Sequence, residues 1–87
     1  MKLSNELILK LKSFGFKKKI LYYSSLKFEM VKQIKVFGRN GYVVVNSDSI
    51  VVDISGDEIF SIKSTSKNLD KTLDYLRQLP IGWGGIN

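Results

Sequence analysis

Two of the side chains that enzymes use most often for catalysis are missing from this sequence. It has no histidine and no cysteine, which removes histidine-based acid–base pairs, serine–histidine and cysteine–histidine nucleophiles, and zinc sites built on those ligands. Catalysis by carboxylate, lysine or tyrosine alone remains open, but a domain of 87 residues has little core in which to enclose a pocket. We therefore predict a protein that is not an enzyme and that holds no cofactor.

A group of carboxylates in the second half of the chain is the closest approach to a metal-binding pattern. Its members are Asp48, Asp53, Asp57 and Glu58. Sites for Ca²⁺ need six or more oxygens, and residues 53–58 lack the ligand spacing of a calcium loop. We therefore expect Asp57 and Glu58 in a solvated hairpin turn, Asp53 on the polar face of a strand, and no bound metal. The glycine clusters GRNG and GWGG also lack the spacing of phosphate-binding loops.

The positive charge is concentrated in the first half of the chain. The net charge of the protein is +6. Residues 1–39 contain ten Lys or Arg and two acids, which gives +8, whereas residues 40–87 contain four basic residues and six acids, which gives −2. Such a basic half attracts an acidic surface, either a nucleic acid or an acidic protein.

The stretch SFGFKKKILYY places three lysines among aromatic residues, as many nucleic-acid-binding proteins do. Its Phe-Gly-Phe triplet lacks the preceding basic residue and the following valine of RNA-recognition strands, so we expect these rings to close a helix into the core. Lys17, Lys18 and Lys19 cannot share one face of a strand, because successive side chains point to opposite faces. We expect them in the connection and at a strand edge, where they either bind a partner or oppose aggregation.

Two segments have the apolar spacing of helices. The first, about residues 5–14, has Ser4 as a candidate N-cap and Gly15 as a candidate left-handed C′ residue. The second, about residues 67–78, carries a narrow apolar stripe and is followed by Pro80, which stops a helix. The stripe consists of Leu69, Leu73, Leu76 and Leu79, and the candidate N-caps are Thr65, Ser66 and Asn68.

Strand-forming segments lie between the two helices. Residues 20–23 are rich in strand-favouring side chains, and residues 27–36 alternate apolar and polar positions. Residues 27–33 also fit helical spacing, and we prefer the strand. Lys32 interrupts the apolar face of this segment, which indicates a bulge or a nearby edge.

Turn-forming residues separate the remaining strands. They are GRNG at 38–41, NSDS at 46–49 and SGDE at 55–58, of which Asn-Gly is the strongest signal because both residues tolerate positive φ. The candidate core residues of these strands are Val44, Ile50, Val52, Ile54, Phe60 and Ile62. The whole order predicts one α+β domain over residues 1–87, in which an antiparallel meander of about five strands carries both helices on one face.

The end of the chain, residues 80–87, is a glycine-rich tail that contains the sole tryptophan, Trp83. This side chain either covers the rim of the core or anchors a partner, because large apolar aromatic residues serve both roles. No segment approaches the ~20 apolar residues that span a bilayer, and the start of the chain lacks the apolar core of a signal peptide. We expect a cytoplasmic protein that does not bind a membrane.

Two functions remain after these exclusions. The first is a small inhibitor that binds an acidic patch on another protein, as a toxin-neutralising immunity protein or an anti-defence factor does. The second is nucleic-acid binding through the basic half, residues 1–39. We favour the first slightly and expect no small-molecule substrate for either. The candidate partner-binding residues are Lys17, Lys18, Lys19, Tyr23, Arg39 and Trp83.

Overall fold

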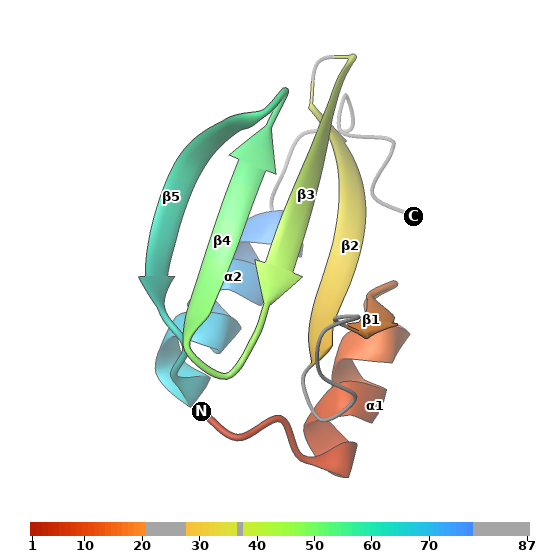
Figure 1. The fold of residues 1–87 in the computed structure, drawn as a ribbon, viewed down its shortest axis with the longest axis vertical. Helices are drawn as coiled ribbons and strands as arrows, with labels where there is room; N and C mark the ends of the chain where they lie inside the picture. The colour runs from red at the N-terminus through yellow and green to blue at the C-terminus, as the bar shows by residue number, and fades with distance from the viewer. Residues whose placement is uncertain (21–27, 37, 78–87) are drawn as a thin grey trace.

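The computed structural model describes residues 1–20, 28–36 and 38–77 (Figure 1). Within these residues two helices flank five strands in the sequence: α1 (Asn5–Ser13), β1 (Lys17–Ile20), β2 (Phe28–Val36), β3 (Arg39–Val45), β4 (Ser49–Ile54), β5 (Asp57–Lys63) and α2 (Ser66–Arg77). The strands form one antiparallel sheet in the order β1-β2-β3-β4-β5, so each strand pairs with its neighbours in the sequence. The predicted α+β meander is confirmed. No helix in these residues is long and apolar enough to cross a membrane.

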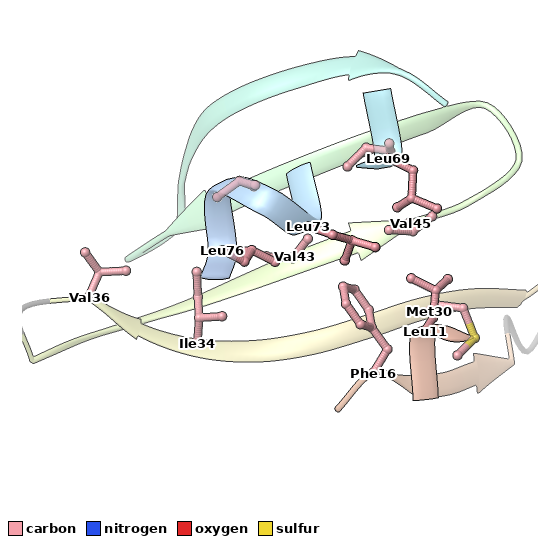
Figure 2. Packing of buried hydrophobic residues seen from close by; sticks show 12 residues of the cluster. Leu11, Phe16, Met30, Ile34, Val36, Val43, Val45, Leu69, Leu73 and Leu76 are labelled. Carbon is pink, nitrogen blue, oxygen red and sulfur yellow. The ribbon is translucent and has the colours of Figure 1, made fainter. Parts of the chain in front are cut away.

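One hydrophobic core lies between the two helices and a single face of the sheet. Leu11 of α1 and the buried leucines of α2 pack in the same cluster as alternate residues of β2 and β3 (Figure 2). Ile50 and Val52 of β4 belong to this cluster as well. Leu11 of α1 and Leu69 of α2 are buried in it beside Ile50 of β4, and Leu11 and Ile50 are fully inaccessible to solvent. Because both helices use that face, the opposite face of the sheet is left without a helix in the described part of the chain (Figure 1). Antiparallel sheets commonly keep one face solvated in this way.

The first helix begins and ends as its sequence predicts. The side chain of Ser4 accepts a hydrogen bond from the backbone N–H of Leu7 at 3.3 Å, which satisfies one of the free donors of the first turn. Gly15 follows the helix with a φ of 92°, in the left-handed region that glycine adopts without steric cost. The backbone N–H of Phe16 then donates to the carbonyl of Leu11 at 3.0 Å, and the Phe16 ring is buried in the core. This turn brings the chain from the helix directly into the edge of the sheet.

The three consecutive lysines form a strand instead of a connection. Lys17, Lys18 and Lys19 make up most of β1, the outermost strand on its side of the sheet. All residues of β1 are exposed, because an edge strand has a neighbour on one side only. The placement of the lysines at a strand edge is therefore confirmed, and their placement in the connection is wrong. Of the predicted strand at residues 20–23, only Ile20 lies within the described residues, where it ends β1.

Strand β2 follows the predicted alternation and carries a buried lysine. Its residues 28–33 are extended, so the strand was the correct choice over a helix. Lys32 points to the core face and is 4% exposed. No bulge occurs there, since Lys32 pairs with Val43 in uninterrupted register; the pairing with β1 stops at the preceding residue, Val31. The bulge of this sheet lies between β4 and β5.

The turn predicted at GRNG is shorter than expected. Strand β3 begins at Arg39, which pairs with Val36, so the chain reverses around Gly38 at a φ of 82°. The Asn40-Gly41 pair lies inside the strand. Gly41 is there because β4 approaches closely: a Cβ on Gly41 would lie 2.6 Å from the backbone oxygen of Asp53. Glycine at this site serves close backbone approach, not a turn.

One core residue of β3 was assigned to the wrong face. Val43 and Val45 are buried in the core, whereas Val44 is half-buried on the opposite face of the sheet. An uninterrupted apolar run gives no alternation from which to choose the inward face. The other core candidates do face the helices: Ile50 and Val52 are buried, and Ile54, Phe60 and Ile62 pack partly buried against the cluster.

The second helix buries the predicted leucine stripe. Leu69, Leu73 and Leu76 are buried against the sheet. Thr65 precedes the helix, and its hydroxyl accepts a hydrogen bond from the backbone N–H of Asn68 at 3.1 Å, so Thr65 provides the cap among the three candidates. The predicted stop at Pro80 and the fourth leucine of the stripe, Leu79, lie outside the described residues.

Candidate anion-binding site on the open face of the sheet

A basic hollow occupies the face of the sheet that the helices leave open. It has a volume of about 460 Å³. Its walls come from the end of the first connection and from β1, β2 and β3. The lining residues are Gly15, Lys17, Lys19, Val31, Gln33, Lys35, Asn40 and Tyr42. All the strand residues among them share one face, because they alternate with the buried residues of the same strands.

The strand register sets the positions of the three lysines in this hollow. Lys17 pairs with Val31, and Lys19 lies two residues further along β1 on the same face, about 6.7 Å away at strand rise. Lys35 lies four residues beyond Val31 on the neighbouring strand. Strand rise and inter-strand spacing together place its Cα about 14 Å from that of Lys17. The hollow therefore has cationic side chains at both ends.

Polar and aromatic side chains fill the space between these cationic ends. Gln33 and Tyr42 are cross-strand partners, and Asn40 pairs with Lys35. Tyr42 is 44% exposed, so much of its side chain is open to solvent. Gly15, from the connection between α1 and β1, also lines the hollow and contributes no side chain to its wall.

No lysine of the hollow forms an ion pair with another described residue. Among the described residues, the two ion pairs are Lys10–Asp70 and Arg77–Asp74, and neither includes a lysine of the hollow. The three ammonium groups are therefore not held in ion pairs and can contact an anionic partner.

Two carboxylates near the hollow are engaged elsewhere. Glu29 stands opposite Lys19 in the register, but it accepts a hydrogen bond from Asn46 Nδ2 at 3.4 Å. Asp53 stands opposite Tyr42, but its Oδ1 accepts from the backbone N–H of Gly56 at 3.0 Å. These hydrogen bonds orient the two carboxylates but do not cancel their charge, so both acids offset part of the positive charge of this face.

The predicted partner-binding residues divide between several places. Lys17 and Lys19 line the hollow, whereas Lys18 points to the other face of β1, where its Nζ lies 4.4 Å from the centre of the Phe28 ring. Arg39 is exposed at the start of β3, next to the β2–β3 turn, and does not line the hollow. Tyr23 and Trp83 lie outside the described residues.

The sequence reasoning did not assign to a site the other polar and aromatic residues of the hollow. These are Gln33, Lys35, Asn40 and Tyr42. Gln33 and Lys35 were correctly placed on the polar face of their strand, so the signal was present. Without the pairing register of β1 and β2, the sequence does not show that Gln33 and Lys35 lie beside Lys17 and Lys19. Asn40 was placed in a turn, and the choice of Val44 as a core residue put Tyr42, two residues before it, on the core face.

The acids that suggested a metal site have ordinary structural places. Asp57 and Glu58 are exposed as expected, but they lie in β5 and not in the turn, which Ser55 and Gly56 form with positive φ. Asp53 holds this turn through its bond to the backbone N–H of Gly56. In residues 1–20, 28–36 and 38–77, no three acidic side chains come together in a geometry that holds a metal ion.

A second, apolar groove lies at the far edge of the sheet, between β4, β5 and α2. It has a volume of about 330 Å³ and is lined by Val52, Ile54, Ile59, Phe60, Ile62, Lys71, Thr72 and Tyr75. Ile59 is the extra residue of the β4–β5 bulge, since Val52 pairs with Phe60 and Asp53 with Glu58. Ile59 and Tyr75 remain 57% and 51% exposed, so this groove presents apolar surface to solvent.

Comparison with known proteins adds no relative to these observations. No protein-family model, no curated protein sequence and no solved structure matches this chain.

Proposed function

We propose that this protein is a non-enzymatic binding protein whose partner is a nucleic acid held on the open face of the sheet. The observation that supports this most directly is the hollow itself. It gathers Lys17, Lys19 and Lys35 around an exposed tyrosine, with no ion pair to any of the three lysines among the described residues. Lysine ammonium groups bind phosphate oxygens and release the counterions that surround them, which is the main source of nucleic-acid affinity.

The composition of the hollow favours a nucleic acid over an acidic protein, the partner that we preferred from the sequence. Lysine is depleted in the cores of protein–protein interfaces, where arginine, large aromatic residues and methionine are enriched. Among the described residues that line it, the hollow has three lysines, two amides, one tyrosine and a single aliphatic side chain, Val31. Amide side chains contact both phosphates and base edges. This combination fits a polyanion with hydrogen-bonding bases.

An acidic protein remains the second candidate, because of the apolar groove beside α2. Exposed apolar side chains such as Ile59 beside Phe60 are typical of surfaces that bind proteins. Lys71 lines this groove and could form an ion pair with an acidic residue of such a partner. In this second function the groove supplies the contact area, and the protein acts as an inhibitor of the kind that the sequence suggested.

Substitution of the three hollow lysines separates these functions. We expect Lys17→Gln, Lys19→Gln and Lys35→Gln together to weaken binding to an oligonucleotide on the order of 100-fold at 0.1 M salt. The logarithm of affinity falls by about 0.7 per phosphate contact for each tenfold rise in salt. Three contacts therefore contribute roughly 2 log units at 0.1 M salt relative to 1 M. Binding is measured by fluorescence anisotropy with a labelled oligonucleotide and, in parallel, with an acidic peptide of equal charge.

A matched variant controls for net charge. Lys2→Gln, Lys12→Gln and Lys67→Gln remove the same three charges from exposed positions that do not line the hollow. The proposal predicts near-normal oligonucleotide binding for this control. If both triple variants lose affinity equally, the interaction depends on net charge alone and the hollow is not the site. If the acidic peptide binds and the oligonucleotide does not, the partner is a protein.

A further inference from the structure

We propose that Tyr42 stacks on a nucleobase, so that the hollow takes single-stranded rather than duplex nucleic acid. This inference rests on the proposed function and adds the class of ligand. Single-strand-binding proteins combine a positive groove for the backbone with aromatic side chains on which bases stack. The open face of this sheet has both features in one hollow.

The position of Tyr42 in the sheet supports a stacking role. Its side chain is 44% exposed although it comes from β3, the central strand of the five. An exposed aromatic ring on a central strand is held by paired backbone on both sides, and Tyr42 pairs with Gln33 on β2 and with Asp53 on β4. A rigid platform of this kind loses little conformational entropy when a base stacks on it.

The lysines flank this platform in the way a single strand requires. Lys17 and Lys19 lie at one end of the hollow and Lys35 lies at the other. At standard strand spacing the Cα atoms of Lys17 and Lys35 are about 14 Å apart. Along the strand direction Tyr42 lies level with the middle of this span, one strand to the side on β3, so a base of a backbone that contacts both ends can reach its ring. Gln33 and Asn40 lie beside the ring with donors and acceptors for base edges. The bases of a duplex are stacked inside the helix and cannot reach the ring without being flipped out.

The test compares two tyrosine substitutions on single strands and on a duplex. The ligands are oligothymidylate and oligouridylate of about 12 bases, within the span of small single-strand-binding folds, and a DNA duplex of equal length. We expect Tyr42→Leu to weaken single-strand binding by roughly 5- to 150-fold, the range of one base–aromatic stack. Tyr42→Phe keeps the ring and is expected to retain binding. The two single strands show whether the site prefers DNA or RNA.

Tyr75→Leu is the matched control, because it removes a comparably exposed tyrosine from α2, which packs on the opposite face of the sheet. Near-normal single-strand binding is expected for this variant. Thermal unfolding of each variant confirms that it is folded under the assay conditions.

The outcomes separate the stacking of Tyr42 from the proposed function. Stacking predicts that Tyr42→Leu lowers affinity for single strands, leaves the weaker duplex binding unchanged and keeps the salt dependence of the wild type. If Tyr42→Leu binds single strands normally while the triple lysine variant does not, stacking is refuted and nucleic-acid binding stands. Equal wild-type affinity for single strands and duplex also refutes it. If no oligonucleotide binds the wild type, both proposals are wrong.

Discussion

Replacing the buried lysine of β2 is predicted to stabilise this protein. Lys32 is 4% exposed on the core face of the sheet, opposite Val43 in the register. Desolvation by burial lowers the pKa of its ammonium group below the usual value. No described residue forms an ion pair with it. A charged group in this position costs stability, because burial removes its hydration and supplies no opposite charge in return.

Methionine is the substitution that isolates this cost, since its unbranched side chain fills nearly the same space without a charge. Lys32→Met would continue the apolar row formed by Met30 and Ile34. We expect a gain of about 1 to 2 kcal/mol in the free energy of unfolding at neutral pH, near the lower end for replacing buried charges by apolar groups. For a domain of this size each kcal/mol raises Tm by roughly 4–8 °C.

The pH dependence gives this prediction a second, independent readout. Below the lowered pKa, Lys32 is charged in both the folded and the unfolded protein, and the full cost of burial applies. As the pH rises through that pKa, the folded protein releases the proton while the unfolded chain keeps it until near pH 10.5, so wild-type stability increases across this window. The advantage of Lys32→Met should therefore be largest near pH 7 and shrink toward pH 10.

Urea unfolding followed by circular dichroism at pH 7, 8.5 and 10 measures both effects. Lys35→Met serves as the control, because Lys35 is exposed on the same strand and its substitution should change stability by less than about 0.5 kcal/mol. A loss of stability in Lys32→Met, or a difference from wild type that does not vary with pH, would show that the ammonium is well solvated or paired and would refute the reasoning.

Two further predictions test the sheet. Gly41→Ala should destabilise the protein by about 1 to 3 kcal/mol, because the new Cβ would meet the Asp53 backbone oxygen at 2.6 Å; an unchanged urea midpoint would contradict the β3–β4 register. Asn46→Ala should cost about 1 kcal/mol, because its side-chain oxygen accepts from the backbone N–H groups of Asp48 and Ser49, both at 2.8 Å. Thermal unfolding measures the second effect, and a Tm equal to that of wild type would show that this turn forms without the side chain.

Much of the fold could be predicted because local signals in the sequence agreed with one another. Ser4 and Gly15 bound the first helix, and the leucine stripe of the second helix faces the core as expected. Errors arose where local signals were ambiguous. The run Tyr-Val-Val-Val of β3 has no alternation, so Val44 was placed on the wrong face. Asn40-Gly41 has turn chemistry, but the close approach of β4 requires the glycine inside a strand.

The candidate site could be predicted only in part, because it is assembled by strand pairing. Lys17 and Lys19 were singled out from their local density of charge, and both line the hollow. Lys35 and Tyr42 belong to the same hollow through the registers of β1 with β2 and of β2 with β3. A register is set by the packing of a whole strand, and a shift of one residue would move each of these side chains to the other face. No short motif in the sequence contains that information.

The salt dependence of oligonucleotide binding tests the central claim most directly. Affinity for single-stranded oligothymidylate is measured between 0.05 and 0.4 M NaCl for the wild type, the Lys17/Lys19/Lys35→Gln variant and the Lys2/Lys12/Lys67→Gln control. Binding in the hollow predicts that the first variant reduces the steepness of the plot of log affinity against log salt by about 2, which is three contacts at about 0.7 each. The control should keep the wild-type slope. Equal slopes in all three proteins, or no binding by the wild type at the lowest salt, would contradict the account.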